Sequence, residues 1–146
     1  MATYTTTIET AWTPREAFDF MADLRNFAVW DPGVSSVEQI SGDGGGVGNE
    51  FDVVISGTPV AMTLRYRTES YDRPRTATVR ASNLLFTSID TITVEKSGDG
   101  SLVTYEADLR LNGPLGLFDL ALKPVFQRIG GRANEGLIAA LSGTQR

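Results

Sequence analysis

The chain has 146 residues, enough to bury one sizeable hydrophobic core but too few for two, and its 13 basic and 18 acidic residues give a net charge of −5. It contains no cysteine and no histidine, which excludes disulfides, iron–sulfur clusters, thiolate chemistry and a Ser-His-Asp triad. No cluster of Lys or Arg is present that could follow a phosphate backbone, so we do not expect nucleic acid as a partner.

The first thirty residues predict one strand followed by two short helices. Residues 2–10 alternate polar and apolar side chains and are rich in threonine, as in a β-strand. The run Thr13-Pro14-Arg15-Glu16 has both halves of a capping box and a proline at the first helical position, so a helix should begin there. A second short turn, through Leu24 and Phe27, should end before Trp30-Asp31-Pro32-Gly33.

From Val34 onward, turn residues at short spacing separate six further predicted strands, with no helical period between them. These strands cover residues 34–41, 48–56, 59–72, 75–82, 85–96 and 101–112. Loops this short favour antiparallel hairpins. The predicted fold class is therefore α+β: a seven-stranded antiparallel sheet wrapped around a long C-terminal helix, with two short helices after the first strand.

A glycine-rich run, Gly42-Asp43-Gly44-Gly45-Gly46-Val47-Gly48, raises the question of a nucleotide site. It has no G-x-G-x-x-G register and lacks the Lys-Ser/Thr pair that completes a P-loop, and it precedes a strand. Two interpretations remain, a flexible hairpin loop or a mobile lid at the mouth of a cavity.

Residues 114–141 carry the one long helical hydrophobic period, with a stripe formed by Phe118, Leu122, Val125, Ile129, Ala133, Leu137 and Ala140. Pro124 removes one backbone hydrogen bond, so the helix should kink or restart there, and we expect the main helix from Pro124 to Leu141. Gly130 and Gly131 each cost about 1 kcal/mol relative to alanine inside a helix. They indicate either close packing against another backbone or room for a ligand.

The alternation of the predicted strands sends one carboxylate, Asp90, to the same covered face as Phe86 and Ile92. Tyr66 and Tyr105 point to that face by the same count. A buried carboxylate needs a partner or a shifted pKa. Asp90 is therefore a satisfied structural group, a residue that a register slip returns to solvent, or a polar anchor in an apolar pocket.

The element order, together with the Trp30-Asp31-Pro32-Gly33-Val34 segment, the Gly100-Ser101-Leu102-Val103-Thr104-Tyr105 strand and the helix start at Gly113-Pro114-Leu115-Gly116, resembles the START/Bet v 1-like (SRPBCC) superfamily. The closer likeness is to its bacterial polyketide cyclase/dehydrase-like members. The resemblance implies a helix-grip fold in which sheet and long helix enclose a cavity, with residues 1–146 as a single domain. It implies activities from lipid and hormone carriage to aromatic polyketide cyclisation. The shared motifs are structural, so no catalytic residue is carried over.

Three hypotheses about function remain. The first is a carrier or sensor that binds a small hydrophobic ligand (lipid, aromatic or polyketide-like) in the internal cavity. The second is a cyclase or dehydratase in which Asp90, Tyr66 and Tyr105 are the catalytic candidates. The third is a partner-binding module with a filled interior and an exposed apolar patch.

For the first hypothesis we expect a ligand-binding set that shares the covered face: Phe18, Trp30, Met62, Leu64, Tyr66, Val79, Phe86, Asp90, Tyr105, Phe126, Ile129 and Gly130. Trp30 could either stack on an aromatic ligand or fill the core where the short helices meet the sheet. We expect no metal and no cofactor. Residues 1–11 lack the regions of a signal peptide and no run approaches 18 apolar residues, so we expect a cytoplasmic protein without an integral membrane segment.

Overall fold

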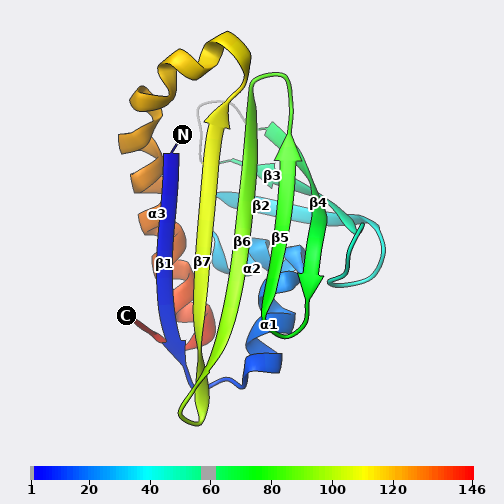
Figure 1. Cartoon of the computed structure of the whole chain (residues 1–146), viewed down its shortest axis with the longest axis vertical. Helices are drawn as coiled ribbons and strands as arrows, with labels where there is room; N and C mark the ends of the chain where they lie inside the picture. The colour runs from blue at the N-terminus through cyan, green and yellow to red at the C-terminus, as the bar shows by residue number, and fades with distance from the viewer. Residues whose placement is uncertain (1, 57–61) are drawn as a thin grey trace.

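The computed structural model describes residues 2–56 and 62–146, with the side chains of residues 117–122 outside the described part. The elements in chain order are β1 (Ala2–Thr10), α1 (Pro14–Ala22), the 3₁₀ turn η1 (Leu24–Asn26), α2 (Phe27–Trp30), β2 (Val34–Ser41), β3 (Glu50–Ile55), β4 (Met62–Asp72), β5 (Thr76–Ser82), β6 (Phe86–Ser97), β7 (Gly100–Leu111), the 3₁₀ helix η2 (Gly113–Phe118), α3 (Asp119–Leu141) and β8 (Thr144–Gln145). In Figure 1, α1 and α2 lie behind the sheet and α3 runs alongside β1.

The strands form one antiparallel sheet in the order β2-β3-β4-β5-β6-β7-β1-β8. The predicted α+β class and the meander from β2 to β7 are confirmed. The strand count was one too low, because the two-residue strand β8 pairs with β1 through Ile8 and Glu9 after the last helix. The predicted start of the fourth strand, at residue 59, lies outside the described residues.

One face of the sheet is buried, and it is the face that the alternation predicted. Its buried side chains recur at every second position on the central strands: Phe51 and Val53, Leu64 and Tyr66, Ala77, Val79 and Ala81, Ile92 and Val94, and Val103, Tyr105 and Ala107. The hydrophobic effect of burying this face favours packing of the helices against it.

The start of α1 follows the capping box seen in the sequence. The Thr13 hydroxyl accepts a hydrogen bond from the Glu16 N–H at 3.2 Å, and the Glu16 carboxylate accepts one from the Thr13 N–H, also at 3.2 Å. These bonds satisfy two backbone donors that the first helical turn leaves free. The helix then buries Ala17, Phe18 and Met21 against the sheet.

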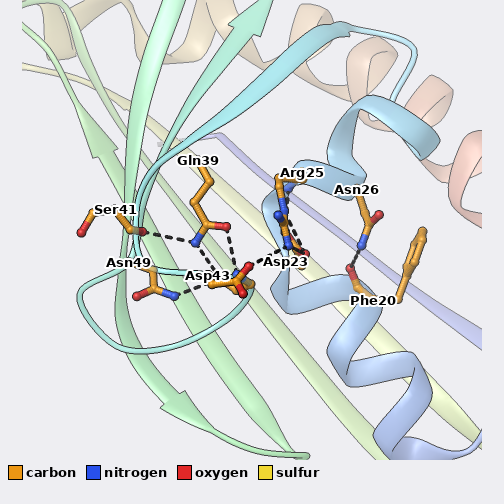
Figure 2. A network of polar contacts seen from close by, with 9 residues as sticks. Phe20, Asp23, Arg25, Asn26, Gln39, Ser41, Asp43 and Asn49 are labelled. Atoms are coloured by element: carbon orange, nitrogen blue, oxygen red, sulfur yellow. Dashed lines mark hydrogen bonds and ion pairs between the residues drawn. The ribbon is translucent and has the colours of Figure 1, made fainter.

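The glycine-rich segment joins β2 to β3 as a hairpin loop, shown in Figure 2. The Gln39 amide spans it by accepting from the Gly44 N–H at 2.9 Å and donating to the Gly44 carbonyl at 3.1 Å. Asp43 forms an ion pair with Arg25 of η1 at 3.6 Å. Gly44 has φ of +70°, a left-handed conformation that glycine adopts without strain.

The long helix begins earlier than predicted. α3 is continuous from Asp119 and contains Pro124, so the expected start at Pro124 was wrong; the loss of one hydrogen bond near the helix start does not end the helix. The predicted stripe is only partly buried. Ala133 and Leu137 are buried, whereas Val125 is 51% exposed. The predicted members Phe118 and Leu122 fall among the side chains outside the described part.

The second half of α3 is fixed to β1 by buried hydrogen bonds. The Thr6 hydroxyl donates to the Asn134 amide oxygen at 2.5 Å, and the Thr10 hydroxyl donates to the Leu141 carbonyl at 2.7 Å. A Cβ atom on Gly136 would overlap the carbonyl oxygen of Trp30, so this glycine lets α3 approach the end of α2. Among the described residues, no helix has the length and apolarity needed to cross a membrane.

The two glycines that the sequence singled out lie in different environments. A Cβ atom on Gly130 would overlap the ring of Tyr4 on β1, so Gly130 permits close packing of the helix on an aromatic side chain. A Cβ atom on Gly131 would meet no described atom within 4 Å. Of these two positions, only position 130 requires a glycine because of a close contact.

We therefore predict opposite effects of the same substitution at neighbouring positions. Gly130→Ala should lower the free energy of unfolding by about 1 to 3 kcal/mol, because the new methyl group must displace Tyr4. Gly131→Ala, the matched control, should raise it by up to about 1 kcal/mol through helix propensity. Chemical denaturation of both variants measures this. A Gly130→Ala variant as stable as Gly131→Ala would contradict the packing assigned to Tyr4.

Candidate functional site

A cavity of about 150 Å³ lies between the buried face of the sheet, α2 and the middle of α3. Most of its wall is apolar, and this part comprises Phe27, Val34, Val53, Ile55, Leu64, Phe86, Ala107, Leu109, Phe126, Ile129, Gly130 and Ala133. Its polar lining comprises Tyr4, Asp31, Tyr66, Ser88, Asp90 and Tyr105. An apolar wall with a few polar groups is the usual composition of a small-molecule site.

Four of the polar side chains form one hydrogen-bonded chain across three strands. The Tyr66 hydroxyl donates to the Ser88 hydroxyl at 3.0 Å, and Ser88 donates to Asp90 Oδ1 at 3.3 Å. The Tyr105 hydroxyl donates to Asp90 Oδ2 at 2.5 Å. We call Tyr66, Ser88, Asp90 and Tyr105 the hydroxyl–carboxyl network.

The strand register explains how these residues meet. Tyr66 of β4, Ala81 of β5 and Ser88 of β6 occupy one row across the sheet, and the small alanine leaves space for the tyrosine to reach Ser88. Asp90 lies opposite Ala107, another small residue, and Tyr105 lies on the same face two positions away on β7. Small residues next to the carboxyl thus allow two phenols to converge near it.

Asp90 is only 3% exposed, which confirms that it faces the interior rather than solvent. Burial raises the pKa of its carboxyl from 3.8 to about 7, although the hydrogen bonds from Tyr105 and Ser88 oppose this shift. The negative charges of Asp31 and Asp108 raise this pKa further. A group with this pKa can both accept and donate protons near neutral pH.

The two tyrosines stay protonated at neutral pH. Burial, followed by the charge of Asp90, holds the pKa of Tyr66 and of Tyr105 well above the ordinary value of 10.0. Both phenols therefore act as hydrogen-bond donors within the network.

Asp31 is a cavity residue that the sequence reasoning did not select. It follows α2, and its carboxylate accepts a hydrogen bond from the Gly33 N–H at 2.9 Å, a turn that its Asp-Pro-Gly sequence could have indicated. Burial raises the pKa of Asp31, and the bond from Gly33 partly opposes this. Asp31 and Val34 also line a shallow surface depression between α2 and α3, so Asp31 lies between the interior and the surface.

Eight of the residues expected in the ligand-binding set line the cavity: Leu64, Tyr66, Phe86, Asp90, Tyr105, Phe126, Ile129 and Gly130. Four others do not line it: Phe18, Trp30, Met62 and Val79. Phe18 is buried under α1 against Tyr71, with ring centroids 5.3 Å apart. Val79 is buried in β5 opposite Asp90, and Met62 is half-buried at the start of β4.

Trp30 belongs to the core, which was one of its two interpretations. It is 2% exposed and makes edge contacts with Phe27 and Tyr105, at centroid distances of 5.1 and 5.3 Å. Among the described residues its indole N–H has no hydrogen-bond partner. Trp30 supports the ring of Tyr105 from the side of α2.

The loop 42–48 contributes no residue to the described cavity wall, where a lid would be expected to lie. Among the side chains that the structure describes, no three acidic groups gather closely enough to hold a metal ion.

A sheet that grips a long helix over an internal cavity defines the START/Bet v 1-like class of proteins. The sequence profile described as "Polyketide cyclase / dehydrase and lipid transport" matches residues 1–142, and the chain belongs to this family. Comparison with curated protein sequences gave no match.

Solved structures show the same fold at low sequence identity. A START superfamily protein from Mycobacterium smegmatis has a TM-score of 0.72 and 13% identity, with 97% of this chain and 94% of that chain covered. XoxI from Bacillus cereus has a TM-score of 0.71 and 21% identity, covering 97% and 96%. The ginseng major latex-like protein 151 from Panax ginseng has a TM-score of 0.65 and 14% identity, covering 96% and 97%.

The raised pKa of Asp90 predicts a specific pH dependence of stability. A carboxyl with a higher pKa in the folded state stabilises the fold below its unfolded pKa, near 4, and this contribution is lost as the pH rises through about 7. The loss should be on the order of 4 kcal/mol at most. Asp90→Asn has no such group, and asparagine can still accept the bond from Tyr105.

Denaturant unfolding of the wild type and Asp90→Asn between pH 4 and 8 measures this contribution. The difference in unfolding free energy between the wild type and the variant should fall as the pH rises. Taking this difference cancels the effects of the other carboxylates, which both proteins share. A difference that stays constant over this range would show that Asp90 is not a buried, titrating carboxyl.

Proposed function

We propose that this protein binds a small hydrophobic molecule in the cavity between the sheet and α3. The observation that carries the proposal is the cavity itself, with its largely apolar wall and four of its six described polar side chains gathered in one network. Burying an apolar ligand there removes apolar surface from water, at roughly 25 cal/mol per Å². The family description, which includes lipid transport, supports the same function.

The cavity volume limits the ligand in this form of the protein. An apolar cavity of about 150 Å³ in another protein accommodates benzene, whereas drug-sized ligands occupy roughly 300 to 1,000 Å³. A cavity of about 150 Å³ therefore suits a single ring or a short aliphatic chain. A larger lipid or polyketide-like molecule would require α3 to move away from the sheet.

A second candidate function is a proton-transfer reaction of the cyclase or dehydratase type. It is favoured by one observation, the contact between Asp90, with its pKa of about 7, and the Tyr105 hydroxyl on the cavity wall. Such a pair can act as a general base and a general acid near neutral pH. Native mass spectrometry of the purified protein, followed by identification of any ligand before and after incubation, separates binding from reaction.

Binding can be tested with ethylbenzene as a single-ring probe, followed by the amide NMR shifts of residues around the cavity. We predict saturable shift changes centred on β6, β7 and the middle of α3. Ala133→Leu should abolish them, because Ala133 lines the cavity and is buried, and the larger side chain occupies the space.

The matched control is Ala139→Leu, the same change at an exposed position of the same helix, which should leave binding unaltered. Circular dichroism establishes that both variants are folded. If the wild type binds no ethylbenzene, or if a folded Ala133→Leu variant binds it as well as the wild type, the proposal fails.

A further inference from the structure

The hydroxyl–carboxyl network on the cavity wall offers hydrogen-bond acceptors rather than donors. With Asp90 ionised, the three hydroxyl protons of the network are already used, since Tyr66 donates to Ser88 and both Ser88 and Tyr105 donate to Asp90. A hydroxyl has one proton but two acceptor lone pairs. The hydrogen-bonding positions that remain free on these groups are therefore oxygen lone pairs. A ligand that hydrogen-bonds to these lone pairs must carry hydrogen-bond donors.

The charge of the described cavity wall is also one-sided. It contains the carboxyls of Asp31 and Asp90, and none of the residues lining it is Lys or Arg. Of the described side chains of α3, the ones that line the cavity are Phe126, Ile129, Gly130 and Ala133. A carboxylate ligand such as a fatty acid would meet two like charges and no counter-ion in a site of low dielectric constant, which is costly.

The aromatic part of the wall suits a cation. Rings of Tyr4, Phe27, Tyr66, Phe86, Tyr105 and Phe126 surround the cavity, and the faces of aromatic rings attract ammonium groups, more strongly where water is excluded. An ammonium group also carries several donors and no acceptor, which complements the free lone pairs.

We propose that the cavity selects small, largely apolar amines, whose protonated nitrogen binds at Asp90 while the apolar part occupies the space under α3. The proposal rests on the proposed binding function and specifies its ligand class. The ion pair offsets the cost of removing the ammonium group and the carboxylate from water together. Asp31, half-buried between the cavity and the surface depression, adds negative charge on the same side.

Binding of an amine should change the protonation state of Asp90. Among the described residues, the titratable and charged groups around Asp90 are Tyr66 of β4, Tyr105 and Asp108 of β7, and Asp31 after α2, and none of these four is a cation. A bound ammonium would supply the missing positive charge and lower the pKa of Asp90. Amine binding near pH 7 should then release a proton from Asp90, whereas a neutral ligand should release none.

The test compares four single-ring probes of similar size: benzylamine, benzyl alcohol, ethylbenzene and benzoate. We expect benzylamine to bind at least about tenfold more tightly than the two neutral probes, and benzoate to bind weakest. Calorimetry in buffers of different ionisation enthalpy should show proton release for benzylamine alone.

Charge-neutralising variants locate the effect. Asp90→Asn should remove the tenfold preference for benzylamine while ethylbenzene still binds, and Asp31→Asn, which leaves the network intact, should reduce the preference. The matched control is Glu106→Gln, the same loss of a carboxylate charge next to Ala107 on β7, where the carboxylate accepts from Thr5 instead of lining the cavity. It should preserve the preference.

The outcomes separate the two proposals. Ethylbenzene or benzyl alcohol binding as tightly as benzylamine would overturn the selection of amines and leave the binding function standing. Benzylamine binding that survives Asp90→Asn unchanged, or that releases no proton, would overturn the assignment of the ammonium to Asp90. Absence of binding by all four probes would overturn both proposals.

Discussion

A carboxyl group inside an apolar wall is tolerated only if other groups hydrogen-bond it or if it holds a proton, and Asp90 imposes this requirement at the centre of the sheet. Tyr105 of β7 and Ser88 of β6 hydrogen-bond the carboxyl directly, and Tyr66 of β4 hydrogen-bonds Ser88. Small residues at Ala81 and Ala107 leave room for the phenols to converge. Packing of Trp30 and Phe27 against Tyr105 then fixes one of these phenols from the side of α2. The polar network, the short helices and the sheet thus depend on one another.

The long helix divides into two parts with different roles. Its second half is attached to β1 through Thr6 and Thr10 and to α2 through the close approach at Gly136. Its middle covers the cavity, and Ile129 is 37% exposed while also lining the interior. The middle of the helix is also held to β1, because the Gln127 side chain donates to the Thr3 carbonyl at 3.1 Å and Gly130 packs closely on Tyr4.

The sequence was sufficient to predict the architecture, because each element carried a local signal. The capping box set the start of α1, and period-two alternation gave the buried face, including the direction of Asp90. Alternation identifies a face but not a position along it, which is why Phe18 and Val79 share the buried side yet lie away from the cavity. β8 has only two residues and no pattern of its own, and its pairing with β1 depends on where α3 ends.

The remaining features depend on distances that no local pattern encodes. Asp31 reaches the cavity because of the turn after α2, and Ser88 connects Tyr66 to Asp90 only because Ala81 lies between their strands. Whether Gly130 provides space or close contact was decided by Tyr4, more than a hundred residues away in the chain. The presence of a cavity likewise depends on how many side chains pack together, which no single stretch of sequence encodes.

The account depends most on the state of Asp90, and ¹³C NMR can observe its side-chain carboxyl carbon directly, with Asp90→Asn used to assign the signal. Titration of the ligand-free protein should give a midpoint near pH 7, because burial and the charge of Asp31 raise the pKa of the carboxyl more than the hydrogen bonds from Tyr105 and Ser88 lower it. A midpoint near 4, the value of a carboxyl in water, would show that Asp90 is solvated and would contradict the structure of the network and the functions built on it.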